Sequence, residues 1–186
     1  MPVFLKGARI LGVVASYSVT EAGPADFDEI AQLVNAAYRS GEGWAHEADL
    51  IDGQRTSRAD LERELAGPEP TVILCLREMP GAPLLACVLL RRKGGHMYLG
   101  MLSVAPNAMD RGLGRTLLDH SEAYARERQA ERVVMTVLDV RDSLIAWYER
   151  RGYRRTGESI PFPYENKSIG KPLRTGLTFS VLEKYL

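Results

Sequence analysis

The sequence predicts a single α/β domain built on a mixed sheet. Its 186 residues suit one domain, and a chain of this length hides roughly two-thirds of its unfolded surface on folding. Strand-like segments dominate the first half, whereas strand-like and helix-like segments alternate in the second half. No internal repeat or low-complexity tract interrupts this pattern.

The charge and cysteine content limit the kinds of partner. The formal net charge is zero, from 24 basic and 24 acidic residues, so no global field favours nucleic acid or an anionic membrane. Two cysteines make no disulfide framework, which fits a reducing cytoplasm. No apolar run approaches the length that spans a bilayer. We therefore expect a cytoplasmic protein whose partners include neither nucleic acid nor membrane.

The first elements follow from short local signals. Residues 1–16 are expected to form an N-terminal extension, and residues 17–186 the domain. A short strand is expected over 17–21, and Pro24 then opens a helix at its first turn, where the missing N–H is not needed. One helix stripe is apolar and comprises Phe27, Ile30, Ala31, Val34, Ala37 and Tyr38.

The segment from 39 to 55 has no sustained period and is rich in Gly and charge. It is too long for a simple connector. A second helix is expected to begin after Thr56 or Ser57 as N-cap and to end near Ala66.

Two apolar segments, 71–78 and 84–91, are joined by a turn that contains Gly81 and predict a hairpin. Cys75 and Cys87 lie equidistant from that glycine. They can therefore be neighbours, and we interpret them as two small buried apolar groups.

The stretch 97–116 forms the centre of the predicted domain. Residues 97–104 carry no charge, which suits a strand buried on both faces, and Pro106 ends it. From Leu113 the apolar residues follow the period of a helix that packs on a sheet. The remaining elements are expected over 132–140 (strand), 142–151 (helix), from 153 (strand) and 176–185 (closing strand), with 160–175 as a long loop or a dimer-contacting arm.

The junction between this strand and helix is a candidate anion site. The first N–H groups of a helix lack intrahelical partners and lie at the positive end of its dipole. Gly112 and Gly114 let the main chain approach a phosphate closely, and Arg111 and Arg115 add charge. Leu117 stands where the dinucleotide-binding fingerprint needs its third glycine. It also stands where a P-loop needs Gly-Lys-Ser/Thr to begin, so neither motif is present. A diphosphate cradle of another kind is expected.

These residues resemble the GNAT superfamily of acetyl-CoA-dependent N-acetyltransferases. The stretch VAPNAMDRGLGRTLL supplies the family's Val-x-Pro turn and then M-x-x-G-x-G, with Met109 in the place of the usual Gln or Arg. The stretch RDSLIAWYERRGY, residues 141–153, resembles the family's late helix with its Tyr, followed by Gly-Tyr. The resemblance implies a GNAT-like fold, with a mostly antiparallel central sheet of six or seven strands and about four helices on both faces.

The resemblance also implies that acetyl-CoA is the cosubstrate. Its pantetheine would pair with Leu102, Ser103 and Val104, and one N–H of this segment would face the thioester oxygen. The diphosphate would lie over Met109, Asp110, Arg111, Gly112, Leu113, Gly114, Arg115 and Thr116.

Tyr148 matches the family's tyrosine, which implies that its hydroxyl donates the proton to the departing thiolate. The alternative is that Tyr148 only packs in the core. The central strand offers Tyr98 and Ser103 but no glutamate as base, so Glu47, Asp49, His46 or a water chain remain open. A missing base favours an acceptor amine of modest basicity.

In similar proteins the segment between the first two helices helps to wall the acceptor site. The acceptor-site candidates are therefore Trp44, His46, Glu47, Asp49 and Asp52. The alternative is that they only fold this loop onto the body. A cluster of arginines, Arg150, Arg151, Arg154 and Arg155, is interpreted as solvated charge rather than as a site for the 3′-phosphate of CoA.

The leading hypothesis is an N-acetyltransferase that moves an acetyl group from acetyl-CoA to a primary amine of a small molecule or peptide by direct attack. An acetyl-CoA sensor without turnover and a nucleotide-binding α/β protein are the alternatives. The three histidines show no metal-ligand spacing, so no metal is expected. Dimerisation is common in similar proteins, and a homodimer is an open expectation here.

Overall fold

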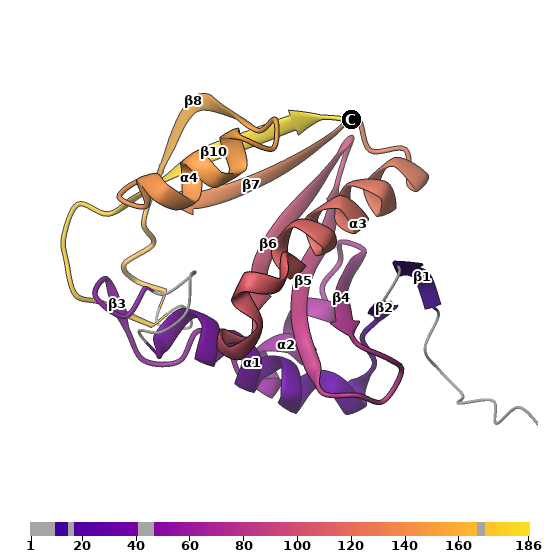
Figure 1. Ribbon diagram of the computed structural model, residues 1–186. Coiled ribbons are helices and arrows are strands. Elements are labelled where there is room, and N and C mark those ends of the chain that lie inside the picture. Colours follow the sequence, from indigo (N-terminus) through magenta and orange to yellow (C-terminus); the bar gives the residue numbers. More distant parts are fainter. Residues whose placement is uncertain (1–9, 15–16, 41–46, 167–169) are drawn as a thin grey trace, which may run out of the picture.

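One eight-stranded sheet crosses the molecule in the computed structural model, which describes residues 10–14, 17–40, 47–166 and 170–186 (Figure 1). In spatial order its strands are β1 (Ile10–Val14), β2 (Tyr17–Glu21), β4 (Thr71–Arg77), β5 (Leu84–Lys93), β6 (His96–Val104), β7 (Arg132–Leu138), β10 (Thr178–Tyr185) and β8 (Arg154–Pro161). All neighbours are antiparallel except β6 and β7. The predicted mixed, mostly antiparallel sheet is confirmed. It has eight strands rather than six or seven because β1, from the N-terminal extension, pairs with β2 at its edge.

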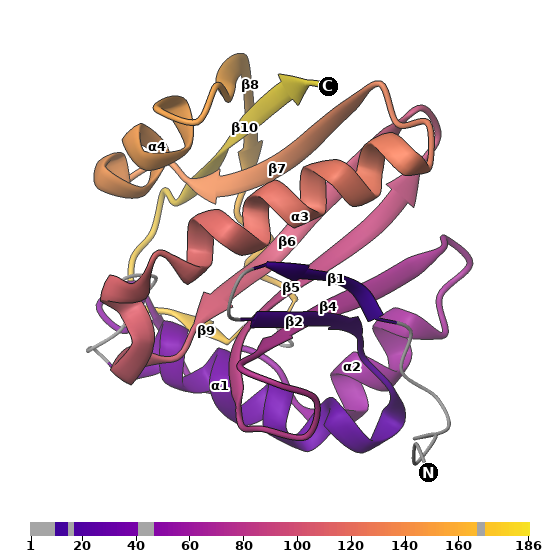
Figure 2. The same cartoon turned by 45° about the vertical axis from the view of Figure 1, so that its right-hand side comes forward.

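In the described part of the chain, four α-helices cover the two faces of the sheet (Figure 2). They are α1 (Phe27–Arg39), α2 (Arg58–Leu65), α3 (Leu113–Glu127) and α4 (Asp142–Glu149). Short 3-10 helices precede two of them, η1 (Pro24–Asp26) before α1 and η2 (Pro106–Arg111) before α3. The Ser57 side chain accepts a hydrogen bond from the Asp60 N–H and so caps α2, as the sequence predicts.

The alternation of side chains along each strand divides the apolar residues into two cores. In β4, Leu74 and Leu76 face α3, whereas Ile73 and Cys75 face α1 and α2. Cys75 lies opposite Cys87 in the register between β4 and β5, and both are buried free thiols. Burial raises the pKa of both thiols, which suits apolar packing rather than reactivity.

A small second sheet joins two loops that are far apart in sequence. β3 (Ile51–Asp52) pairs with β9 (Lys171–Pro172), and the Leu173 N–H donates to the Leu50 carbonyl at 2.8 Å. Leu50 and Ile51 pack with residues at the end of β7 and in the arm before β10, namely Leu138, Phe162 and Leu177. The segment expected as a long loop, 160–175, is therefore tied to the loop between α1 and α2. Within the described ranges, no helix is both long and apolar enough to cross a bilayer.

Candidate active site

β6 and β7 begin side by side and then diverge, which opens the centre of the sheet (Figure 1). The two strands pair over three positions only, from His96 opposite Arg132 to Tyr98 opposite Val134. On its other edge β6 stays paired with β5 as far as Val104. Among the described residues, the β6 backbone from Gly100 to Val104 has no strand partner on the β7 side of this gap, so an extended ligand chain can pair with it as an extra strand.

A β-bulge interrupts β6 at this gap. Met101 adopts a positive φ of 57°, which is uncommon for a residue with a side chain. The bulge changes the alternation of side chains between the two faces of the sheet. Leu99 before the bulge and Leu102 after it both face α3, whereas Met101 between them faces α1. Ser103 Oγ donates to the Met101 carbonyl at 3.0 Å, and the Tyr38 hydroxyl donates to the Leu102 carbonyl at 3.4 Å. Both carbonyls of the bulge are thus held by side chains, which fixes the orientation of the peptide groups between them.

The start of α3 lies beside the gap and fits an anion. Gly112 is the N-cap and adopts a left-handed φ of 71°, and a Cβ there would project into open space. Leu113 is fully buried and anchors the first turn of α3 in the core. A Cβ on Gly114 would meet Val104 and Trp147 at 3.6 and 3.8 Å, so this glycine lets the first turn of α3 lie close to the end of β6 and to α4. The predicted strand, turn and helix N-terminus are all present.

The side chains of the predicted cofactor segment differ in their roles. Met109, Asp110 and Arg111 lie in η2 before the N-cap, and Thr116 Oγ1 donates back to the Gly112 carbonyl. The Arg111 guanidinium is turned toward β2 and the β4–β5 turn, where it contacts the Glu78 carboxylate at 2.6 Å and the Tyr17 hydroxyl at 3.1 Å.

Arg151 is a candidate anion ligand that the sequence interpretation placed among solvated charges. Unlike Arg150, Arg154 and Arg155 it is half-buried, and its guanidinium lies 3.5 Å from the Trp147 ring centroid. Its Nε is buried and has no hydrogen-bond partner among the described residues. Burial and the nearby Arg115 and Arg150 lower its pKa, so it lies in a locally positive region at the start of α3.

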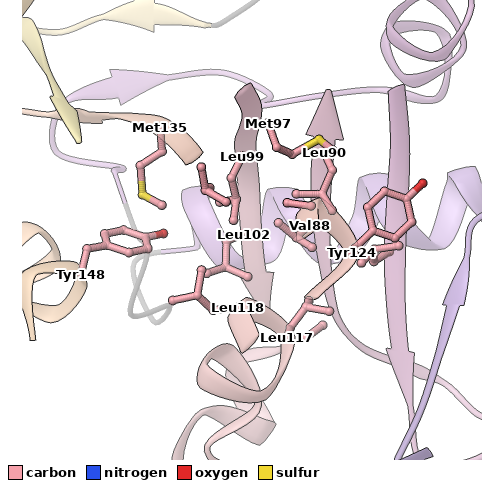
Figure 3. Packing of buried hydrophobic residues seen from close by; sticks show 14 of the residues in the cluster. Val88, Leu90, Met97, Leu99, Leu102, Leu117, Leu118, Tyr124, Met135 and Tyr148 are labelled. Carbon is pink, nitrogen blue, oxygen red and sulfur yellow. The ribbon is translucent and has the colours of Figure 1, made fainter. Parts of the chain in front are cut away.

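Tyr148 projects from α4 toward the gap, on the same face of the sheet as α3. Figure 3 shows its ring below Met135, with the hydroxyl directed toward Leu99 and Leu102 of β6. The residue is 5% exposed and makes edge-on ring contacts with Trp147 and Tyr153.

The environment keeps the Tyr148 hydroxyl protonated. Burial raises its pKa above the ordinary value of 10.0, and Tyr38, Arg141 and Tyr98 are close enough to contribute. Burial likewise raises the pKa of Tyr38 to about 12. Both hydroxyls are therefore neutral proton donors at the gap.

A cleft of about 650 Å³ opens on the other face of the sheet, between α2 and the strands. Its floor comes from β5, β6 and β7 and includes Leu89, Tyr98, Gly100, Met101 and Thr136. The Tyr98 hydroxyl is hydrogen-bonded to Thr136 Oγ1 at 3.2 Å across the diverging strands. Because the bulge residue Met101 lines it, the cleft reaches the gap from the side opposite α3.

The predicted acceptor-site residues either do not line this cleft or fall outside the described ranges. Trp44 and His46 fall outside the described residues. Asp49 and Asp52 are exposed, and neither they nor Glu47 line the cleft.

Glu47 instead joins two elements through buried ion pairs. One carboxylate oxygen lies 3.1 Å from Arg39 Nη1 at the end of α1, and the other lies 3.6 Å from Arg141 Nη1 at the N-cap of α4. The side chains of all three residues are between 10% and 12% exposed. The carboxylate thus fixes the loop before β3 against the helix that carries Tyr148.

Replacing Glu47 by glutamine should lower the free energy of unfolding by about 2 to 3 kcal/mol, because both buried guanidinium groups lose a charged partner. Urea unfolding measures this change. Glu62→Gln is the control, since it breaks the exposed Arg58–Glu62 pair and should change stability little. Equal effects of the two substitutions would contradict the bridging role of Glu47.

No cluster of three His, Cys, Asp or Glu side chains suited to a metal ion occurs among the residues that the structure describes.

Comparisons with known proteins agree with this geometry. The model of the Acetyltransferase (GNAT) family matches residues 27–153. The structure resembles the crystal structure of the ribosomal-protein-S18-alanine N-acetyltransferase from Escherichia coli, with a TM-score of 0.64 and 15% identity over 91% of this chain and 93% of that one. It resembles that of a GNAT-family acetyltransferase from Staphylococcus aureus with a TM-score of 0.65 and 14% identity over 91% of this chain and 99% of that one. It also resembles the crystal structure of nourseothricin acetyltransferase, with a TM-score of 0.62 and 18% identity over 92% of this chain and 99% of that one. No curated protein sequence matches the chain.

Proposed function

Because the chain belongs to the GNAT acetyltransferase family and is therefore an acyltransferase, we propose that it transfers an acetyl group from acetyl-CoA to a primary amine by direct attack. The observation that carries the proposal is the gap between β6 and β7 with the bulge at Met101. A helix N-terminus and Tyr148 face this gap from one side of the sheet, and a cleft reaches it from the other side. Donor and acceptor can thus approach the same backbone segment from opposite faces.

The donor side would hold acetyl-CoA through the backbone. The N–H groups at the start of α3 would bind the diphosphate, and Gly112 and Gly114 keep that approach open. Arg151, with its unpartnered Nε, would add a positive charge. The open edge of β6 over Leu102, Ser103 and Val104 would pair with the pantetheine.

When bound, acetyl-CoA supplies an acyl group activated as a thioester. A backbone N–H of the Leu102–Val104 segment, oriented by the bulge, would donate to the acyl oxygen, where negative charge grows during attack. The Tyr148 hydroxyl would donate its proton to the departing sulfur, while the proton that the nitrogen loses as the amide forms would pass to solvent water, from which the hydroxyl would be reprotonated. Placement of the two reactants supplies much of the remaining acceleration.

Among the described residues, the cleft lining offers no free carboxylate as a base. Each of its three acidic side chains, Asp60, Glu64 and Glu69, already has an arginine partner. This supports an acceptor that reaches the site as a neutral amine. The named relatives act on different acceptors, an alanine of ribosomal protein S18 and nourseothricin, so the fold alone selects none.

Thiol release from acetyl-CoA, measured with a broad panel of primary amines, tests the proposal. We expect free thiol and an acetylated amine, identified by mass spectrometry, in equal amounts. Binding of acetyl-CoA by calorimetry without any amine-dependent thiol release would refute the proposed transfer.

A further inference from the structure

Among the described residues that line the cleft, positive charges outnumber negative ones. Arg63 pairs with Asp60, and Arg91 pairs with Glu64 and lies 3.8 Å from the Glu69 carboxylate. These pairs account for all three carboxylates of the lining. Two further cations, Arg55 and Lys93, also line the cleft.

Arg55 and Lys93 face aromatic rings instead of carboxylates. The Arg55 guanidinium lies 5.5 Å from the Tyr38 ring centroid, and Lys93 Nζ lies 5.4 Å from the Tyr98 ring centroid. Neither cation has a carboxylate partner among the described residues. A cation over an aromatic face keeps its capacity to bind an anion, because the ring accepts no strong hydrogen bond.

The same two tyrosines connect these cations to the gap. Tyr38 reaches the bulge through its hydrogen bond to the Leu102 carbonyl, and Tyr98 reaches β7 through Thr136. The Tyr98 ring also covers Gly100, where a Cβ would come within 3.0 Å of the ring. Each cation thus contacts a tyrosine that itself lies against the β6 backbone, at Leu102 for Tyr38 and at Gly100 for Tyr98.

We propose that the acceptor is a small-molecule amine that also carries an acidic group, bound by Arg55 and Lys93 while its amine points to the gap. The inference rests on the proposed acetyl transfer and names the acceptor class. A volume of about 650 Å³ fits a small molecule. The four cations of the described lining exceed its three carboxylates by one positive charge, which attracts an acidic group and repels a second amine, so polyamines are disfavoured.

A matched set of acceptors tests this inference in the thiol-release assay. Each amino acid is compared with its aminophosphonate analogue, its amide and its decarboxylated amine at the same pH. We expect kcat/KM for the best acidic acceptors to exceed that of the neutral counterparts by about tenfold or more, as one charge-assisted contact provides. The aminophosphonate arm distinguishes a carboxylate from a phosphate-like acid.

Charge-removing variants assign the preference to the two cations. Arg55→Gln and Lys93→Gln should each raise KM for the acidic acceptor about tenfold and leave KM for acetyl-CoA unchanged. Lys93→Arg keeps the charge and should keep most of the preference. Arg154→Gln removes one positive charge from the exposed strand β8, away from the cleft lining, and serves as the control.

The outcomes separate this inference from the proposed function. If amides or polyamines react as well as the acids, or if both Gln variants keep the preference, the acidic acceptor is refuted while acetyl transfer stands. If no amine reacts, acids are titrated into the CoA-loaded protein by calorimetry. Binding that Arg55→Gln abolishes then supports the acid site, and no binding overturns it. Failure to bind acetyl-CoA at all would refute the proposed function instead.

Discussion

Replacing Tyr148 by phenylalanine should lower kcat by about 100-fold or more and leave the affinity for CoA unchanged, because the change removes the proton donor and keeps the ring. The ring fills a buried position between Trp147 and Tyr153, so the fold should tolerate the loss of one hydroxyl. Steady-state kinetics with saturating acetyl-CoA give kcat, and calorimetry gives the CoA affinity.

The pH profile adds a second test of Tyr148. Burial raises its pKa above 10.0, so the hydroxyl stays protonated throughout an ordinary assay range. We therefore expect the pH–activity profile of the wild type to have the same shape near pH 10 as that of Tyr148→Phe. A fall in wild-type activity near pH 10 that is absent from Tyr148→Phe would contradict this.

Tyr153→Phe provides the matched control for Tyr148→Phe. Tyr153 is equally buried and touches Tyr148, but its hydroxyl is hydrogen-bonded to Glu122 at 3.2 Å, away from the gap. Its loss should reduce stability and leave kcat nearly unchanged. Equal kcat values for the wild type and Tyr148→Phe would assign Tyr148 to packing only, the alternative that the sequence left open.

The fold was largely predictable because its elements carry strong local signals. The uncharged segment 97–104 forms β6 and is buried on both faces, and Pro106 ends it as expected. The order of later elements is also as predicted, with small differences at their ends: β7 ends at Leu138 and β10 begins at Thr178. Element ends depend on neighbouring strands and loops, which a local pattern does not contain.

The site was predictable only where its function depends on the backbone. The glycines in the sequence indicate a helix N-terminus that can bind phosphate, and Gly112 has the positive φ that such a turn needs. The bulge at Met101 has no such signal in the sequence, because methionine rarely adopts a positive φ. The bulge also changes which side chains of β6 face each side of the sheet, and this change is visible only once the burial of each side chain is known.

Charged side chains were the least predictable part of the site, because their partners are distant in sequence. Arg151 has three arginine neighbours in the chain, yet only Arg151 lies over Trp147 with a buried Nε. Glu47 fitted a catalytic base by its position, and the structure places it between two arginines 8 and 94 residues away in sequence. Only the fold determines which charges meet.

Replacing Gly112 by valine should weaken CoA binding by about 10- to 100-fold, because the backbone amides at the start of α3 would lose the orientation that charge-assisted hydrogen bonds to phosphate require. The left-handed φ of 71° costs a residue with a side chain about 1 to 2 kcal/mol, and a β-branched residue is especially unsuited to it. The strain is relieved by a change of this φ, which turns the neighbouring peptide groups. Calorimetry with CoA measures the effect directly.

Gly176→Val separates loss of the site from general strain. Gly176 has a φ of 72°, and a Cβ there also meets nothing within 4 Å, so the two substitutions impose similar backbone strain. Gly176 lies in the segment before β10 and outside the α3 junction, so its variant should lose stability but bind CoA as the wild type does. If the two variants bind CoA equally well, the amides around Gly112 do not hold the diphosphate. The donor side of the gap would then have to be assigned to another part of the molecule.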